Sequence, residues 1–248
     1  MSEHSLDGVG VLVTRPRQQA GELVEAIEAR GGMGIVFPVI EILPRNEADV
    51  QQDLDALDDA AITVFVSRNA VEHGLAYADG RIAAIGPTTA EAIEQGGAHV
   101  DICPASGFDS EHLLMEAGFD DVAGKTIRII RGNDGREHLA NALSERGASV
   151  EYLSTYERRR PDYTAQELAS LEQRWRAGEV SVAVVMSVQS LENLGDLLPD
   201  WCRQQLPLTR LVTPAARVLK EALRQYPGCP AILAAGPRNS DIVDAIAQ

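Results

Sequence analysis

The sequence predicts an α/β protein in which two similar domains each hold a five-stranded parallel sheet flanked by helices. Three observations support this prediction. Short β-rich runs alternate with helical patterns along the chain, which is typical of parallel sheets covered by helices. One part of the chain repeats the motifs of another in the same order. The length of 248 residues also exceeds the usual size of one domain.

The first strand–helix–strand unit stands near the N-terminus. Residues 9–14 (VGVLVT) form an apolar run typical of a buried strand. Residues 16–30 follow with apolar positions at helical spacing, and Gly31 ends this helix before a strand at 35–37. Further strands are expected, with helices between them, at 62–66, 82–85, 100–103, 126–130, 150–153, 180–186, 208–212 and 231–234.

An internal repeat relates the two halves of the chain. The segment GVLVTRPRQQAGELVEAIEARGG resembles TIRIIRGNDGREHLANALSERGA, which places Arg15 on Arg131, 116 residues further on. The repeat also pairs, in the same order, Gly31 with Gly147, Ser67 with Ser187 and Pro87 with Pro214. We therefore expect two domains of the same kind.

Two extended segments divide the predicted strands into two groups of five. Residues 38–42 and 155–160 are poorly helical, and the prolines beside them favour extended geometry. Five strands lie between these segments and five lie outside them. We therefore predict a flavodoxin-like fold whose chain crosses twice: residues 1–37 and 161–248 form one domain, 43–154 the second, and 38–42 with 155–160 a two-stranded linker. Two consecutive domains with a boundary near residue 120 are the alternative.

The charge balance excludes several classes of partner. Acidic residues outnumber basic ones 37 to 22, which gives a net charge of −15. Nucleic acids and anionic membranes bind basic surfaces, so we expect neither as a partner. Lys125 and Lys220 are the only lysines. This acidic, lysine-poor composition predicts a surface suited to high salt.

The sequence also carries hypotheses about location. The first ten residues lack the basic start and apolar run of a signal peptide. The longest apolar stretch, around 180–188, is too short to span a bilayer. Three cysteines, Cys103, Cys202 and Cys229, form no C-x-x-C pair and are typical of a reducing compartment. We expect a cytoplasmic monomer.

Motifs for common cofactors are missing. No G-x-G-x-x-G follows a strand, and there is neither a P-loop nor a nucleophile elbow. Five histidines are scattered without metal-ligand spacing and are expected at the surface: His4, His73, His99, His112 and His138. We expect neither a cofactor nor a metal ion.

Hydroxyl groups or glycines followed by helix starts stand at the ends of several predicted strands. The carboxyl ends of parallel strands line the ligand crevice of open α/β sheets, and helix N-termini favour anions. Any one such turn is equally explained as a helix cap, but together they predict a cleft for a polyanionic ligand. The turns are Thr14-Arg15-Pro16, Ser67-Arg68-Asn69, Gly86-Pro87-Thr88-Thr89, Met186-Ser187 and Thr213-Pro214.

Several segments resemble the uroporphyrinogen-III synthase family. The matching motifs are V-L-V-T-R-P-x-x-Q-A (Val11 to Ala20), F-P-x-I-E-I (Phe37 to Ile42), F-V-S-R-N-A-V (Phe65 to Val71), A-I-G-P-T-T-A (Ala84 to Ala90), S-E-H-L-L (Ser110 to Leu114), R-G-N-D-G-R-E (Arg131 to Glu137) and T-Y-E-R-R-x-P (Thr155 to Pro161). They cover essentially the whole chain in order. The resemblance implies two α/β domains joined by a two-stranded linker, with the active site in the cleft.

The resemblance implies a cofactor-free hydro-lyase of tetrapyrrole biosynthesis. Its substrate is hydroxymethylbilane, which loses its terminal hydroxyl as water to leave an azafulvenium. The substituted carbon of ring D attacks, and the resulting spiro intermediate fragments and recloses as uroporphyrinogen III with ring D inverted. A non-catalytic two-domain binder or regulator of an anionic metabolite is the alternative.

The resemblance also implies roles for individual residues. Tyr156 matches the family's acid, and a phenol can donate a proton to the departing hydroxyl; the alternative is a tyrosine that only packs in the linker. In the second half Ala215 and Ala216 stand where the first half has Thr88 and Thr89, so two hydroxyls often found there are missing. The candidate substrate-binding residues are Arg15, Ser67, Arg68, Asn69, Gly86, Thr88, Thr89, Arg131, Ser187 and Thr213.

Overall fold

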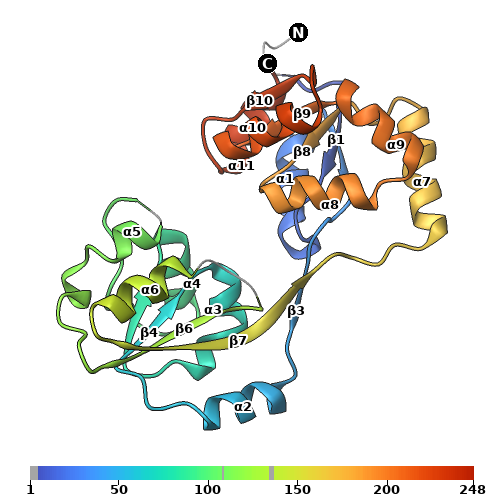
Figure 1. Cartoon of the computed structure of the whole chain (residues 1–248). Helices are drawn as coiled ribbons and strands as arrows, with labels where there is room; N and C mark the ends of the chain where they lie inside the picture. The colour runs from blue at the N-terminus through green and yellow to red at the C-terminus, as the bar shows by residue number, and fades with distance from the viewer. Residues whose placement is uncertain (1–4, 108, 134–136) are drawn as a thin grey trace. The chain divides into compact units, whose positions relative to one another are not determined.

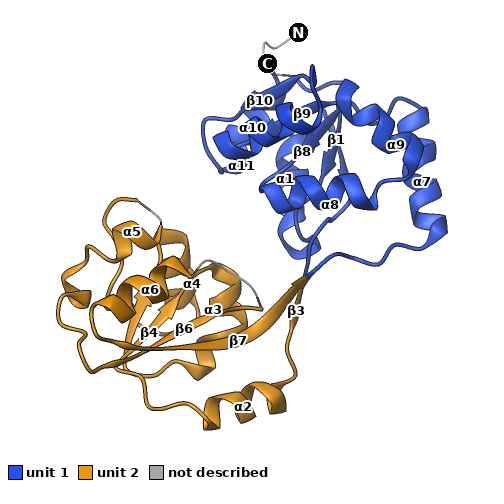
Figure 2. Ribbon diagram, viewed as in Figure 1, with its two compact units in different colours: residues 1–41, 159–248 blue, residues 42–158 orange. Residues whose placement is uncertain are grey.

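A computed structural model describes residues 5–107, 109–133 and 137–248 of the chain (Figure 1). The chain divides into two compact units (Figure 2): unit 1 holds residues 1–41 and 159–248, and unit 2 holds residues 42–158. Each unit contains one five-stranded sheet flanked by helices, which confirms the α/β class. That each unit is an independent domain, with the bounds expected from the sequence, stays a prediction.

The sheet of unit 1 has the order β10-β9-β8-β1-β2, and its strand pairs are parallel. The strands are β1 (Gly10–Val13), β2 (Met33–Val36), β8 (Val182–Val184), β9 (Arg210–Thr213) and β10 (Ala231–Leu233). The helices are α1 (Arg17–Glu28), α7 (Ala165–Arg176), α8 (Val188–Leu197), α9 (Asp200–Gln205), α10 (Ala216–Gln225) and α11 (Asn239–Ile246), and a 3₁₀ turn spans Leu206–Leu208.

The core of unit 1 follows from its amphipathic helices. In α1 the residues Ala20, Leu23 and Ile27 recur at helical spacing and are buried. They pack with α11 against Val11 and Val13 of β1 in one apolar cluster. Gly31 ends the turn after α1 with a φ of +84°, a conformation that favours glycine. The predicted helix at 16–30 is thus confirmed.

The sheet of unit 2 has the order β3-β7-β6-β4-β5. The strands are β3 (Glu41–Pro44), β4 (Ile62–Phe65), β5 (Arg81–Ala84), β6 (Thr126–Gly132) and β7 (Ser149–Arg159). The helices are α2 (Glu47–Asp55), α3 (Arg68–Gly74), α4 (Pro87–Gln95), α5 (Ser110–Leu113) and α6 (His138–Glu145), with 3₁₀ turns at Leu75–Tyr77 and Ala117–Phe119.

This second sheet is mixed, and the prediction of a wholly parallel sheet was wrong for its edge. The N–H of Arg45 donates to the carbonyl of Thr155 at 3.0 Å, while Glu41 pairs with Arg159 at 3.2 Å. Residue numbers therefore rise along β3 as they fall along β7, which makes this pair antiparallel. The strand β7 runs on through most of the linker predicted at 155–160.

The fifth strand of unit 2 is also not the one expected. Residues 100–103 contribute only a single bridge, between Ile102 and Ala83, and β3 completes the sheet instead. Pro104 follows closely and has no N–H to donate, which limits pairing after Ile102.

None of the helices in the described part of the chain has the length and apolar character that a membrane span requires.

Candidate functional site

The carboxyl ends of the parallel strands of unit 2 meet at one edge of its sheet. From β4 the chain moves to β5 on one side, whereas β6 pairs with β4 on the other side. The strand order therefore reverses between β4 and β6, and ligands of open α/β sheets bind at such a point. Ser67 follows β4 at this position, and Gly132 ends β6.

A pair of hydroxyl groups lies at this point. The Ser67 Oγ and the Tyr156 Oη are 3.2 Å apart, and either atom can be the donor. Ser67 is also the N-cap of α3, because its Oγ accepts the N–H of Ala70 at 3.1 Å. Tyr156 is only 4% exposed. The cap thus fixes the serine, and the serine in turn fixes the phenol.

An irregularity in β7 aims the Tyr156 ring at this site. Arg131 of β6 is opposite Ser154, but the next residue, Gly132, is opposite Tyr156. Thr155 is therefore the extra residue of a β-bulge, and it is buried together with its neighbour Tyr156. Bulges re-aim side chains in this way.

Gly132 leaves the space that the ring occupies. A Cβ atom at this position would lie 2.7 Å from Cε2 of Tyr156, closer than real contacts allow. The ring therefore crosses over β6 toward Ser67 because residue 132 has no side chain.

His73 completes the surroundings of the phenol. Its ring on α3 lies 5.6 Å from the Tyr156 ring, centroid to centroid, with the planes tilted by 44°. The side chain is partly buried, so the surface position expected for His73 was only partly right. Neither His73 nor Gly132 is among the site residues predicted from the sequence. The sequence signal for Gly132 was its place in the R-G-N-D-G-R-E motif, directly after a predicted strand.

The other candidates of unit 2 lie at the starts of α3 and α4. Arg68 is exposed and Asn69 is partly buried in the first turn of α3. Gly86 is the N-cap of α4, with a proline at the first helical position, and Thr88 is exposed while Thr89 is buried. The two helices pack together, so these turns are neighbours at the same edge of the sheet.

Arg131 is not brought together with Tyr156. A Cβ on Gly132 would touch the Tyr156 ring, and consecutive residues of a strand point to opposite faces. Arg131 therefore projects from the other face of the sheet, where its guanidinium lies 4.3 Å from the centroid of the Tyr152 ring. Residues 134–136 of the R-G-N-D-G-R-E motif, like His4, lie outside the described residues.

Three candidates belong to unit 1, at the carboxyl ends of its strands. Arg15 follows β1, where the strand order reverses between β1 and β8. Its Nη1 donates to Oδ1 of Asn239 at 2.7 Å and its Nη2 to the carbonyl of Pro237 at 3.4 Å. Burial lowers the pKa of Arg15. Its Nε is buried and finds no hydrogen-bond partner in the part of the chain that is described.

Ser187 and Thr213 act as local caps. The Oγ of Ser187 accepts the N–H of Ser190 at 3.0 Å and begins α8. The Oγ1 of Thr213 accepts the N–H of Ala215 at 3.3 Å. Ala215 itself gives no side-chain cap to α10, and the helix starts at Ala216. Thr213 therefore supplies the hydroxyl of this turn.

The described residues bring no three His, Cys, Asp or Glu side chains together as metal ligands. What the site of unit 2 offers is a buried phenol held by a serine, with Arg68 in the helix turn that follows β4. Such a set can transfer a proton and bind anions.

Comparisons with known proteins agree on one family. The family model "Uroporphyrinogen-III synthase HemD" matches residues 21–244. The chain is 32% identical to the uroporphyrinogen-III synthase of Escherichia coli strain K12 over 229 residues, which cover 86% of this chain and 90% of that protein. It is 33% identical to the Salmonella typhimurium enzyme of the same name over 215 residues, 79% of this chain and 82% of that one.

Solved structures agree on the fold. The Helicobacter pylori uroporphyrinogen-III synthetase superposes with a TM-score of 0.65 at 14% identity, covering 95% of this chain and 97% of that chain. A mutant of the Thermus thermophilus enzyme superposes with a TM-score of 0.60 at 20% identity, covering 94% and 95%.

Proposed function

The chain belongs to the uroporphyrinogen-III synthase family, and on this premise we propose how its own residues carry out the reaction. The protein is a cyclising hydro-lyase of tetrapyrrole biosynthesis. We propose hydroxymethylbilane as the substrate and uroporphyrinogen III as the product. The observation that supports this assignment of roles best is the contact between Tyr156 and Ser67, at the point where the strand order of a sheet reverses.

Tyr156 is the proton donor in this proposal. The lone pair of the terminal pyrrole nitrogen expels the hydroxyl, and the phenol protonates it, so that water leaves and an azafulvenium remains. Ser67 lies within hydrogen-bond distance of the phenol oxygen and donates to the phenolate as its charge develops, which lowers the barrier. The phenolate recovers its proton when the last ring carbon is deprotonated.

The choice of product isomer is a problem of positioning. The substituted carbon of ring D must meet the electrophile before the free carbon does. It forms the new bond, the spiro intermediate fragments, and the second closure inverts the ring. Holding the two reacting carbons in contact removes most of the entropic barrier, which is worth several kcal/mol.

The carboxylates of the substrate supply the handles for this positioning. Hydroxymethylbilane carries eight of them. Arg15 and Arg68 are proposed to bind carboxylates through the fork of the guanidinium, with Asn69, Gly86, Thr88, Thr89, Ser187 and Thr213 as further contacts. We propose that the enzyme acts as a cytoplasmic monomer with two α/β domains, residues 1–37 with 161–248 and residues 43–154.

The test of this function is the identity of the product isomer. Freshly made hydroxymethylbilane is supplied to the protein, and the oxidised products are resolved by chromatography. We expect type III, whereas a reaction without protein gives type I. Product that is all type I would contradict the proposal. It would favour a binder or regulator on the same scaffold if the protein still bound the bilane.

A further inference from the structure

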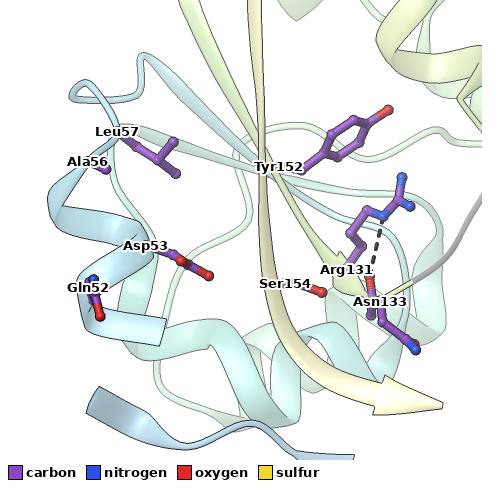
Figure 3. Close-up of a pocket in the computed structure, with 9 residues that line it drawn as sticks. Gln52, Asp53, Ala56, Leu57, Arg131, Asn133, Tyr152 and Ser154 are labelled. Atoms are coloured by element: carbon purple, nitrogen blue, oxygen red, sulfur yellow. Dashed lines mark hydrogen bonds between the residues drawn. The ribbon is translucent and has the colours of Figure 1, made fainter. Parts of the chain in front are cut away.

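A pocket of about 510 Å³ lies on the face of the unit 2 sheet away from Tyr156. Residues after and within α2 line one side, and Arg131, Tyr152 and Ser154 line the other. Figure 3 shows Arg131, Tyr152 and Asn133 on one side of β7, and Gln52, Asp53 and Leu57 across it. All of these residues belong to unit 2, so the pocket is complete within one compact body.

Arg131 is the one cationic side chain among the described residues that line this pocket. Its Nε donates to the carbonyl of Gly132 at 3.3 Å, and among the residues described no carboxylate pairs with it. Tyr152 lies beneath the guanidinium at 4.3 Å and holds its plane by a cation–π contact. The two Nη atoms of Arg131 are therefore held in an orientation in which they can donate to both oxygens of one carboxylate.

The acid in the pocket is already paired. Oδ2 of Asp53 accepts from Nη1 of Arg45 at 2.7 Å, and the same Nη1 donates to the carbonyl of Ser154 at 2.8 Å. Asp53 is the one acid among the lining residues described. An anion that enters the pocket thus meets a net positive charge.

Ser154 gives a second, independent sign of a ligand. Its Oγ is buried and has no hydrogen-bond partner in the described structure. A buried hydroxyl without a partner costs about 1–3 kcal/mol. Ser154 itself is partly exposed and lines the pocket, so a rotation about its Cα–Cβ bond would bring the hydroxyl to a ligand acceptor and remove that cost.

We propose that this pocket binds one carboxylate-bearing pyrrole ring of the tetrapyrrole, remote from the bond on which Tyr156 acts. The inference rests on the proposed function. A single carboxylate would fill little of the pocket volume, whereas a pyrrole with its two carboxylate arms is of the right size class. Arg131 and Ser154 bind the carboxylate, and the apolar surface of Leu57 and Tyr152 contacts the ring. Such a remote contact stabilises the bound substrate and the transition state equally, so it lowers KM without changing kcat.

The test separates binding from chemistry in the full-length protein. Arg131→Ala should raise KM for hydroxymethylbilane about tenfold or more, the effect of losing a hydrogen bond to a charged group. It should leave kcat within about twofold and the product type III, because Arg131 does not touch the reacting carbon. Arg81→Ala is the matched control, since Arg81 is an exposed arginine at the start of β5, the opposite edge of the same sheet. An unchanged KM in Arg131→Ala, or a loss confined to kcat, would overturn the proposal.

Ser154→Ala keeps the test decisive if Arg131→Ala does not fold. A hydroxyl that serves the ligand should be dispensable in the free protein, so the melting temperature should stay the same or rise. KM should nevertheless increase about threefold to tenfold. A lower melting temperature with an unchanged KM would assign Ser154 to structure and refute its role in binding.

A third measurement distinguishes failure of this site from failure of the proposed function. Uroporphyrin III, the stable oxidised form of the product, is titrated against each variant by calorimetry. If the wild type gives only type I product, the proposed function fails. The pocket is then supported by weaker uroporphyrin binding in both variants and overturned by equal binding.

Discussion

Tyr156 depends for its position on two residues of other strands and helices. Ser67 is 89 positions earlier and holds the phenol oxygen, and Gly132 leaves room for the ring. The sequence predicts the cap at Ser67, because a cap is a local pattern of a hydroxyl before a helix. It does not predict the contact, which requires the bulge at Thr155 and the pairing of β6 with β7.

Tyr156→Phe tests the acid. The ring and its packing stay, so substrate binding should change little. Loss of the proton donor should lower kcat by about 10²-fold or more, the usual contribution of a general acid. Steady-state kinetics with isomer analysis measures this, and an unchanged kcat with type III product would show that Tyr156 is structural.

Gly132→Ala tests the space beneath the ring. The added Cβ would approach Cε2 of Tyr156 to 2.7 Å, so the ring must move away from Ser67. We expect a loss of about 1–3 kcal/mol in the free energy of unfolding, typical of overpacking, together with a lower kcat. Gly21→Ala, where a Cβ meets nothing within 4 Å and φ is not positive, is the control for an added methyl group without a clash. Full activity in Gly132→Ala would contradict this role of the glycine.

At the scale of elements, the sequence predicts the buried strands and amphipathic helices, but it does not predict which strands form the edges of a sheet. The helix at 17–28 and the strand at 10–13 follow from apolar periodicity and were predicted. The strand expected at 100–103 was wrong, since an isolated apolar run does not reveal which neighbour supplies its hydrogen bonds. Arg131 shows the same limit for the site. The predicted strand ended at residue 130, one position before Arg131, whereas β6 runs on to Gly132. A shift of one residue along a strand decides which face a side chain occupies.

Tyr163, which lies just before α7, should make the free energy of unfolding decrease at alkaline pH. The Tyr163 Oη donates to the carbonyl of Pro38 at 2.8 Å, and its ring stacks on Phe37 at 4.5 Å. Burial raises the pKa of Tyr163. A raised pKa means that this contribution is present below the unfolded pKa of about 10 and is lost as pH rises above it.

We therefore expect the free energy of unfolding in urea to fall between about pH 9 and about pH 11. Burial also raises the pKa of the Cys202 and Cys229 thiols, so the contribution of Tyr163 is the difference in slope between the wild type and Tyr163→Phe. Tyr163→Phe should cost about 1 kcal/mol at pH 8 for the lost hydrogen bond, and should flatten the slope. Burial also raises the pKa of Tyr226, so Tyr226→Phe gives the matched comparison. An identical slope in Tyr163→Phe would contradict this account.

At the scale of the whole molecule, we expect unit 2 to fold without unit 1. Residues 42–158 contain nearly all of the five strands of their sheet and a complete apolar cluster. Expressed alone, this segment should unfold cooperatively in urea. Residues 1–120 lack β6 and β7 and serve as the comparison. Cooperative unfolding of 1–120 but not of 42–158 would favour consecutive domains.

The acidic charge of the molecule should also shape how its activity responds to salt. Repulsion between a net charge of −15 and an octacarboxylate acts at long range, and it is screened beyond about 10 Å at 0.1 M salt. Contacts with partly buried groups such as Arg15 are screened less. KM for hydroxymethylbilane should therefore stay constant or fall from about 0.1 M to about 2 M potassium chloride. A steep rise at constant circular dichroism would show that exposed arginines dominate binding.

The antiparallel pairing of β3 with β7 also sets an order of assembly during translation. The ribosome releases β1 and β2 first, but their sheet stays incomplete until β8, β9 and β10 emerge more than 140 residues later. By then all of unit 2 has been synthesised, and we expect the pairing of β3 with β7 to have brought the two ends of its 117 residues together. Closing a loop of that length costs about 3 kcal/mol more than closing one of a few residues. If unit 2 folds first, the two segments of unit 1 are already held close together, and the entropic cost of completing the sheet of unit 1 is lower.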